Sequence, residues 1–280
     1  MKIMVTGAAG NYGSLAIDYI KQFAPDTELY GLIHDPSKAS ALEAKGVNVR
    51  VADYADKSSL VKAFEGIDRL LFVSVPVTDL QKNVVAALRE SNISYVAYTS
   101  IAGITANKFG LQINHAQTEN MIADTGIAHT FLRNNWYLEL DEAIIKAAVQ
   151  TGKFYYLSDK KISWTLRREY AEAGAKVILG EGYPKVIELT RNAVTYPELA
   201  SAIEQATSRN LDVRKVTPQE FEENLSNAGI DNMGKALAMN MQNYAQCDNG
   251  EEHFTQTAFE QVLGHPLSSL ADSVKELLDK

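Results

Sequence analysis

The sequence predicts an α/β fold in which a doubly wound parallel sheet is followed by a smaller C-terminal α+β domain. Three observations support this fold. Strand-like and helical runs alternate through the first half, the strand-like runs are continuously apolar, and glycines directly follow the first of them. Continuous apolar runs are expected when parallel strands are covered on both faces. Alternation with short loops is expected when each crossover is a right-handed helix.

The elements of the first half can be assigned in order from hydrophobic period and capping residues. Strands are predicted at residues 2–6, 28–33, 47–52, 69–75, 95–99 and 128–132. Helices are predicted at residues 36–45, 58–65, 79–91, 114–125 and 138–151. Asp35, Asp56 and Thr78 precede three of these helices, where their side chains can act as N-caps.

The second half follows a different pattern, in which helices outnumber strands. A short strand and a helix are predicted within residues 161–180, and another strand at residues 185–189. Mostly helical segments are predicted at residues 196–208, 218–227, 231–244, 255–263 and 268–278.

Composition and charge narrow the class of protein. Cys247 is the single cysteine among 280 residues, which excludes an internal disulfide and a zinc cluster and favours a reducing cytoplasm. The net charge of −8 argues against nucleic-acid binding, which needs a basic face. The longest apolar run, residues 70–77, is too short to span a membrane. Because the first strand begins near residue 2, no signal peptide is expected before it.

Three glycines follow the first strand at the spacing G-x-x-G-x-x-G. Gly7 allows a tight turn, Gly10 lets the backbone approach a pyrophosphate, and Gly13 lets the next helix pack closely on the strand. The N-terminus of that helix offers free N–H groups to phosphates. This context predicts a Rossmann-type dinucleotide site; the alternative is a plain βα turn with glycines for packing. The predicted cofactor-binding residues here are Gly7, Ala9, Gly10, Asn11, Tyr12 and Gly13.

We therefore expect two domains. Residues 1–155 form a dinucleotide-binding Rossmann domain. Residues 156–280 form a smaller, mostly helical domain beside a substrate cleft, with some segments returning to the Rossmann sheet.

Ligands bind outside the carboxyl ends of parallel strands, so the residues after each strand are candidates. After the second strand, His34 and Lys38 could hold a 2′-phosphate, whereas Asp35 could bind the ribose of NAD or only cap a helix. Asp53 is placed to bond an adenine amine with Tyr54 beside it, although Asp53 could equally be a turn residue.

The fourth and fifth strands end in small or hydroxyl residues. Ser74, Val75 and Pro76 follow the fourth strand, and Thr99 and Ser100 end the fifth. These five residues are predicted to lie along the nicotinamide half of a cofactor, where they leave room and can bond its ribose. Their alternative role is ordinary capping of strand ends.

His115 is the candidate polar residue over the cofactor. Short-chain reductases normally carry Tyr-x-x-x-Lys on the helix after the fifth strand, so that the tyrosine can protonate a carbonyl oxygen. Here Leu111 stands at the tyrosine position and His115 at the lysine position. His115 contacts the cofactor or substrate in one interpretation and is purely structural in the other.

An amide and aromatic cluster follows the sixth strand. Asn135, Trp136 and Tyr137 suit a flat, conjugated ligand, because aromatic faces stack and amides orient polar edges. The alternative is a core tryptophan and tyrosine with polar neighbours. Arg167, further along, is expected to brace the two domains through ion pairing.

Taken together, these residues identify a family resemblance. The chain resembles the NmrA-like atypical short-chain dehydrogenases, and among them the bacterial NADPH-dependent quinone oxidoreductases and their triphenylmethane reductase relatives. The matching residues are 5–13, 52–54, 97–100, 115 with 118–119, 132–137, 167 with 170–171, and 263–266. The resemblance implies NADPH as hydride donor, a quinone or similar acceptor as small-molecule partner, and a cleft between two domains. The oligomeric state is left open, with a homodimer as one candidate.

The chain also departs from that family. His34 stands where the family has an arginine that grips the 2′-phosphate, so NADH remains an alternative to NADPH. Leu140 replaces an asparagine, and Trp164 replaces a small residue that borders the cleft. A second hypothesis is a non-catalytic redox sensor that binds the dinucleotide without turnover, as some NmrA-like proteins do.

Overall fold

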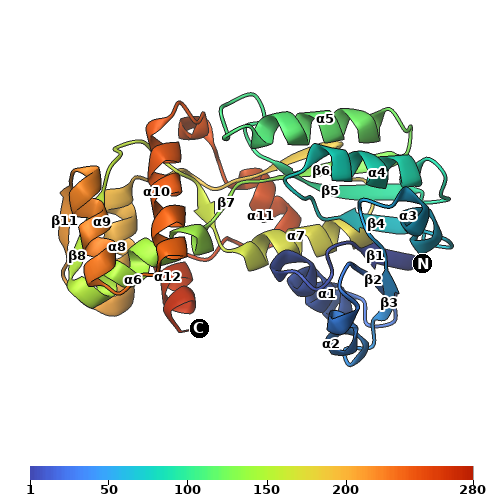
Figure 1. Cartoon of the computed structure of the whole chain (residues 1–280), viewed down its shortest axis with the longest axis horizontal. Coiled ribbons are helices and arrows are strands. Elements are labelled where there is room, and N and C mark those ends of the chain that lie inside the picture. The colour runs from blue at the N-terminus through green and yellow to red at the C-terminus, as the bar shows by residue number, and fades with distance from the viewer. Residues whose placement is uncertain (280) are drawn as a thin grey trace.

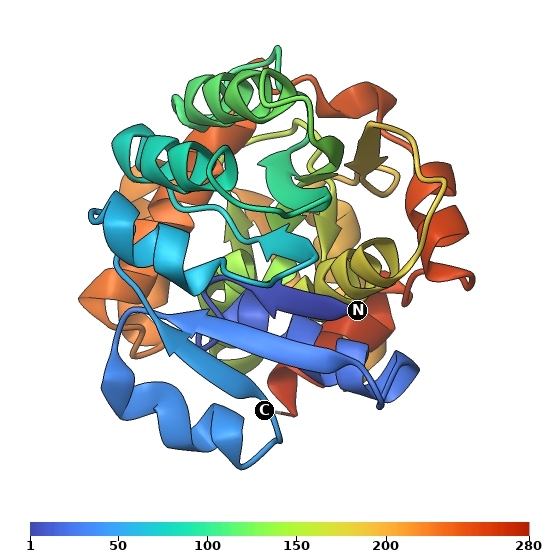
Figure 2. The same cartoon turned by 90° about the vertical axis from the view of Figure 1, so that its right-hand side faces the viewer.

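The computed structural model describes residues 1–279, and its centre is a seven-stranded parallel sheet with the order β10-β6-β5-β4-β1-β2-β3. The predicted doubly wound α/β fold is thereby confirmed. Figure 2 shows β1 near the middle of the twisted sheet. The seven strands are β1 (Lys2–Val5), β2 (Glu28–Ile33), β3 (Asn48–Val51), β4 (Arg69–Phe72), β5 (Tyr95–Ile101), β6 (Ala128–Asn134) and β10 (Val186–Leu189).

Helices cover both faces of this sheet (Figure 1). One layer contains α3 (Lys57–Ala63), α4 (Thr78–Leu88) and α5 (Leu111–Ala123). The opposite layer contains α1 (Asn11–Phe23), α7 (Arg167–Leu179) and α11 (Thr257–Leu263). Side chains alternate between the layers: Met4 packs with the first, whereas Ile3 and Val5 pack with the second. Burial on both faces explains the continuous apolar strands of the sequence.

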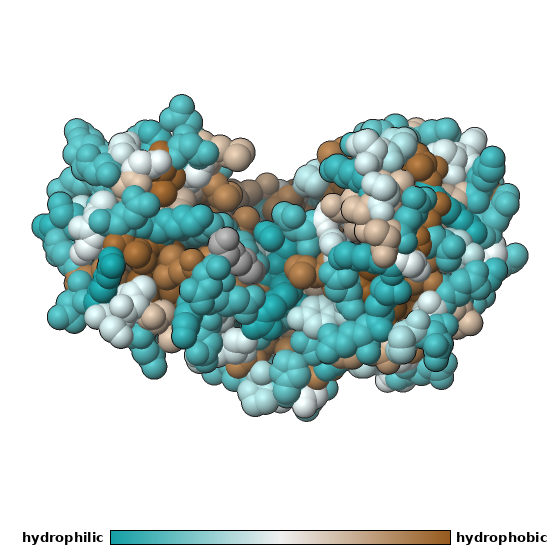
Figure 3. Space-filling view, turned by 90° about the horizontal axis from the view of Figure 1, so that it is seen from below, coloured by the Kyte–Doolittle hydropathy of each residue, from teal (hydrophilic) through white to brown (hydrophobic). Residues whose placement is uncertain are grey.

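The rest of the chain forms a smaller lobe with its own hydrophobic core (Figure 1). Its helices are α6 (Glu142–Thr151), α8 (Tyr196–Thr207), α9 (Pro218–Asn227), α10 (Asn232–Gln246) and α12 (Leu270–Leu278). Two short parallel pairs complete it, β8 (Lys153–Tyr156) with β11 (Asp212–Lys215), and β7 (Trp136–Tyr137) with β9 (Trp164–Thr165). The space-filling view shows the molecule hollowed between the two lobes (Figure 3).

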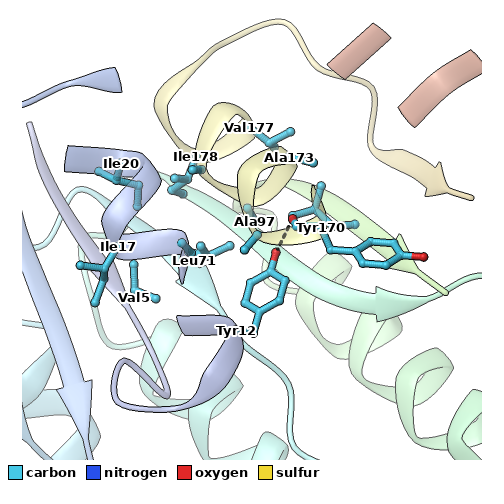
Figure 4. Packing of buried hydrophobic residues seen from close by; sticks show 14 of the residues in the cluster. Val5, Tyr12, Ile17, Ile20, Leu71, Ala97, Tyr170, Ala173, Val177 and Ile178 are labelled. Carbon is cyan, nitrogen blue, oxygen red and sulfur yellow. Dashed lines mark hydrogen bonds between the residues drawn. The ribbon is translucent and has the colours of Figure 1, made fainter. Parts of the chain in front are cut away.

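Segments far apart in the sequence join the halves. β10 comes from the second half of the chain and pairs with β6 at the sheet edge. α7 lies along α1, and the Tyr12 hydroxyl donates to the Tyr170 carbonyl at 3.0 Å between these helices (Figure 4). Gly174 makes this approach feasible, because a Cβ there would lie 2.3 Å from the Tyr12 hydroxyl.

Element boundaries differ from the sequence expectations at a few places. Asp35 and Asp56 cap their helices by accepting from Ser37 and Ser58, as predicted. Thr78 is not a cap, because it lies inside α4 and its hydroxyl donates to a side chain on α5 instead.

Two predicted helices also start differently. The predicted helix over residues 114–125 begins earlier, at Leu111, after a left-handed Gly110. The predicted helix over residues 138–151 opens with a 3₁₀ turn, η2 (Leu138–Asp141), before α6. Within residues 1–279, no helix has the length and apolarity needed to cross a membrane.

Candidate functional site

The glycine loop after β1 is shaped as the motif predicts. Gly7 adopts a positive φ of 57°, and the Gly10 amide donates to the Gly7 carbonyl at 2.9 Å. A Cβ on Gly13 would lie 2.3 Å from that same carbonyl oxygen, so a side chain is sterically excluded there. Gly10 is the N-cap of α1 and supplies no side-chain cap. The first-turn N–H groups of α1 are therefore free to bind an anion.

This loop forms one wall of a cavity of about 480 Å³ at the carboxyl ends of β1 to β4. The structure brings together here most of the predicted cofactor-binding residues. The cavity is lined by Gly7, Gly10, Asn11, Tyr12, Gly13, Leu32, Ile33, His34, Ala52, Asp53, Tyr54, Val73, Ser74, Val75 and Leu80. The remaining predicted site residues do not line it; they are Ala9, Lys38, Pro76, Thr99, Ser100, His115, Asn135, Trp136 and Tyr137.

At the β2 and β3 end of the cavity, His34 and Asp53 face each other. Their closest atoms, Nδ1 and Oδ2, are 3.8 Å apart, and both side chains are well exposed. Asp53 also accepts from the Ala55 amide at 2.8 Å, so it combines the turn role and the pocket position that the sequence left open. Asp35 is occupied as the cap of a 3₁₀ helix, Pro36–Lys38, and the exposed Lys38 at its end is the N-cap of α2 (Ala39–Glu43).

At the β4 end, the wall is the segment Ser74–Val75. The Ser74 amide donates to the Thr99 hydroxyl at 2.8 Å, and the Thr99 hydroxyl donates to the Ser74 hydroxyl at 3.0 Å. Thr99 thus supports the wall from β5 without lining the cavity. Pro76 is exposed just beyond it.

Ser100 lies outside the cavity because it has another partner. Its hydroxyl donates to Glu119 on α5 at 2.6 Å. The same carboxylate receives two hydrogen bonds from Arg133, which also contacts Glu188 at 3.0 Å. Ser100 therefore belongs to a mostly buried charged network that ties α5 to the sheet.

His115 lies on α5, packed against β5, and is held in its neutral form. Its Nδ1 lies 2.9 Å from the hydroxyl of Tyr98, a fully buried residue of β5. Burial lowers the pKa of His115 from 6.5 to about 4, against a smaller opposing effect of Glu119. The ring is therefore uncharged at neutral pH and cannot act as a cationic acid.

The cluster after β6 faces inward rather than toward the cavity. The Asn135 amide nitrogen donates to the Ser163 carbonyl at 2.8 Å and to Glu251 at 2.9 Å. The Trp136 ring lies 4.6 Å from the ring of Tyr244 in an edge-to-face arrangement. These contacts favour the structural alternative for Asn135 and Trp136.

Tyr137 is the member of that cluster that borders the interface between the lobes. Its ring packs edge-to-face on Tyr170, 5.3 Å between centroids, and lies 4.9 Å from the Arg167 guanidinium carbon. The prediction of an ion pair for Arg167 is wrong within the described residues 1–279. Its backbone amide donates to the Glu139 carboxylate, but its guanidinium has no acidic partner there. Arg167 instead lines a second cavity of about 590 Å³ that shares Gly10 and Asn11 with the first.

Sequence reasoning missed a fully buried cluster behind Asn135. Lys108 donates to Glu251 at 2.7 Å and also to the Tyr244 hydroxyl, which itself donates to Glu251. The other Glu251 oxygen accepts from the Ser163 amide at 2.6 Å. Burial lowers the pKa of Lys108, and Glu251 opposes that shift. No local motif marks this cluster, because Lys108 lies 143 residues before its partner Glu251 along the chain.

Sequence reasoning also missed the amides of Gln81 and Asn114. The Val75 amide donates to Gln81 Oε1 at 3.2 Å, and Asn114 Nδ2 donates to the Val75 carbonyl at 3.1 Å. The only signal for this contact in the sequence is a glutamine directly after the apolar Leu80, and the structure shows that this glutamine is buried on α4.

Comparison with known proteins assigns the chain to a family. The sequence profile of the NmrA-like family matches residues 1–276. Quinone oxidoreductase 2 of Escherichia coli K12 is 31% identical over 285 residues, covering 99% of each chain. The solved structure of the Escherichia coli NADPH-dependent quinone oxidoreductase with NADPH is 31% identical, covers 99% of each chain and gives a TM-score of 0.85.

A second enzyme structure is equally similar. The Citrobacter sp. triphenylmethane reductase complexed with NADP(H) is 29% identical, covers 99% of this chain and 100% of that one, and gives a TM-score of 0.87. The glycine loop, the parallel sheet and the full-length matches agree with the resemblance found from the sequence. The chain belongs to the NmrA-like family.

Proposed function

We propose that this protein is an NAD(P)H-dependent oxidoreductase that reduces a quinone or a similar conjugated acceptor, with NADPH as the favoured donor. The observation that carries the proposal is the cavity of about 480 Å³ beside the uncapped N-terminus of α1. The similar proteins described above include a quinone oxidoreductase and a triphenylmethane reductase that bind NADPH or NADP(H).

The residues present fit a dinucleotide. A Cβ would lie 2.3 Å from the Gly7 carbonyl oxygen at Gly13 and 3.1 Å from it at Gly10, so a backbone surface with free amides faces the cavity. These amides would hold the pyrophosphate, Asp53 and Tyr54 would border the adenine, and Ser74–Val75 would border the nicotinamide half. When bound, the reduced nicotinamide supplies the hydride.

The choice of donor depends on His34 and Lys38. His34 lines the cavity end that would receive the adenosine ribose, and Lys38 is exposed four residues later in the chain. Lys38 supplies a permanent positive charge and His34 a hydrogen bond, which together favour a 2′-phosphate, although Asp53 at 3.8 Å from His34 opposes it. We therefore expect NADPH to be preferred over NADH by a modest factor.

The acceptor would bind between the two lobes. Tyr137 of β7 in the smaller lobe packs on Arg167, which begins α7 on the sheet, so this contact joins the two lobes. The division proposed from the sequence, residues 1–155 and 156–280, assigns each of these residues to the other domain. The second cavity, which Arg167 lines, adjoins the glycine loop and offers apolar side chains from Leu140, Leu237 and Leu277. The same cavity also presents Glu139 and Glu142. The leucine side chains and the Arg167 guanidinium would form the part of it that suits a flat acceptor whose oxygen gains negative charge.

The test is oxidation of the reduced coenzyme by a panel of quinones, followed as loss of nicotinamide absorbance. Asn11→Asp is the matched variant, because it places a carboxylate at the first turn of α1, where it stabilises the helix but repels phosphate. Its control is Asn232→Asp, the same change at the exposed first turn of α10. We expect Asn11→Asp to weaken NADPH binding at least tenfold (about 1.4 kcal/mol) and Asn232→Asp to have no effect.

The same assay separates the two hypotheses from the sequence. If neither NADPH nor NADH is consumed with any quinone, the reductase proposal is rejected. Binding of oxidised and reduced coenzyme without consumption would favour the redox sensor. Absence of binding in a calorimetric titration would reject both.

A further inference from the structure

The Ser74–Val75 wall is held by side chains from two helices that do not line the cavity. Gln81 lies on α4 and Asn114 on α5, and both are buried. Together they satisfy both backbone polar groups of Val75, with the amide bonded to Gln81 and the carbonyl to Asn114. A wall segment outside any helix or strand thereby acquires a fixed position.

The direction of each hydrogen bond is determined by these backbone groups. Because the Val75 N–H can only donate, Gln81 presents Oε1 to it, and because the Val75 carbonyl can only accept, Asn114 presents Nδ2. Gln81 Nε2 then donates to Asn114 Oδ1 at 2.9 Å and to the Thr118 hydroxyl at 2.8 Å. Thr118 agrees with this direction, since its own proton goes to the Asn114 carbonyl at 2.9 Å.

The direction propagates to His115 through Tyr98. The Tyr98 hydroxyl lies 3.1 Å from Gln81 Oε1, which can only accept, so Tyr98 donates its single proton there. Burial raises the pKa of Tyr98, so the hydroxyl keeps that proton. The 2.9 Å contact between Tyr98 and His115 Nδ1 is then a hydrogen bond only if Nδ1 carries the hydrogen.

We infer that Gln81 and Asn114 are positioning residues for the Ser74–Val75 wall, and that the same hydrogen bonds commit His115 to the tautomer with hydrogen on Nδ1. The other nitrogen, Nε2, is left with a lone pair and can only accept. His115 retains 8% exposure, and within residues 1–279 its ring is hydrogen-bonded at Nδ1 and not at Nε2. His115 therefore recognises an O–H or N–H group of a ligand and does not protonate the reduced acceptor.

This inference rests on the proposed function, because the Ser74–Val75 wall matters only if the cavity binds a coenzyme. The first test of the inference is nevertheless independent of activity. Protein labelled with ¹⁵N in histidine is studied by NMR at neutral pH, and His115 is assigned by loss of its signals in His115→Gln. We expect a protonated, pyrrole-type Nδ1 and an unprotonated, pyridine-type Nε2. Tyr98→Phe removes the acceptor for Nδ1–H, so this pattern is expected to change. A pyrrole-type Nε2 in the unsubstituted protein overturns the assignment.

The second test measures the wall. Gln81→Met keeps the size of the side chain and removes all four of its hydrogen bonds, whereas Gln22→Met makes the same change on the exposed face of α1. We expect the dissociation constant of NADPH to rise about tenfold in Gln81→Met and to stay constant in Gln22→Met. The KM for NADPH should rise more than kcat falls, because the wall contacts the coenzyme and not the reacting atoms.

The outcomes separate the two proposals. If the unsubstituted protein binds no coenzyme, the proposed function fails while the tautomer of His115 still stands or falls by NMR. If it binds coenzyme and folded Gln81→Met binds equally well, the positioning role is rejected. Should Gln81→Met not fold, Asn114→Asp replaces it, since a carboxylate cannot donate to the Val75 carbonyl and must weaken NADPH binding by a similar factor.

Discussion

The ends of β1 and β6 lie at the same edge of one sheet, yet they differ in where their polar groups point. After β1, backbone amides of the glycine loop and the α1 N-terminus open onto a cavity. After β6, the Asn135 amide nitrogen is held by the Ser163 carbonyl and by Glu251, 116 residues later in the chain. The Asn135 amide oxygen, the Asn134 amide and the Trp136 indole N–H are buried there without a partner in the part of the chain that the structure describes. The two ends differ in access, because the unpartnered groups after β1 line the cavity, whereas those after β6 are buried and do not line it. Which groups become buried depends on distant segments such as the one that carries Glu251.

The largest effect on this comparison is expected from removing the negative charge of Glu251, which holds the Asn135 amide nitrogen after β6. Glu251→Gln leaves the buried Lys108 without its ionic partner, so we expect the free energy of unfolding to fall by about 3–5 kcal/mol in urea titrations. The double variant Lys108→Met with Glu251→Gln should recover part of this loss. Lys82→Met removes an exposed pair with Asp79 as a control, with an effect below about 1 kcal/mol. Equal effects of Glu251→Gln and Lys82→Met would contradict the closed arrangement.

Asp141, a buried carboxyl of the smaller lobe, predicts a pH dependence of the free energy of unfolding. Asp141 is fully buried and accepts from the Trp164 indole at 2.6 Å, and burial raises its pKa from 3.8 to about 7. The folded protein therefore keeps a proton that the unfolded chain releases above about pH 4. Stability contributed by this group is complete below about pH 4, falls as the pH rises to about 7, and then stays constant.

The measurement is the unfolding free energy between pH 4 and 8 for Asp141→Asn. Relative to this variant, the unsubstituted protein should lose roughly 4 kcal/mol across that range, the equivalent of about three pKa units. Asp26→Asn, at an exposed position, should run parallel to the unsubstituted protein. Parallel curves for Asp141→Asn would mean that Asp141 is not held protonated by the fold.

The same contrast explains what the sequence could predict. The parallel sheet, the glycine loop and the cavity position of His34 follow from local order, because strand, turn and helix are consecutive. The burial of Asn135 depends on Glu251, and the support of Val75 depends on an asparagine 39 residues away. Side chains that satisfy distant backbone groups carry no periodic signal, so only the folded structure identifies them.

At the strand ends that line the cavity, the comparison can be tested further by changing the preference for NADPH over NADH. His34→Arg places a permanent guanidinium where the 2′-phosphate would lie, so we expect NADPH to bind about tenfold tighter and NADH to be unaffected. Calorimetric titration of both coenzymes measures the ratio. His253→Arg, at an exposed position that does not line the cavity, is the control for added charge. An equal gain for NADH would show that position 34 does not face the 2′-phosphate.

The smallest expected effect concerns Tyr12, whose ring lines the cavity while its hydroxyl leaves it. Because the hydroxyl donates to the Tyr170 carbonyl (Figure 4), Tyr12→Phe should lower the unfolding free energy by about 1 kcal/mol and leave NADPH binding within about twofold. Tyr30→Phe, which removes an exposed bond to Glu28, should change stability by a few tenths of that amount. If Tyr12→Phe instead weakened NADPH binding tenfold at constant stability, the Tyr12 hydroxyl would contact the coenzyme. It would then belong with the groups after β1 that bind ligand and not with those that bond protein partners.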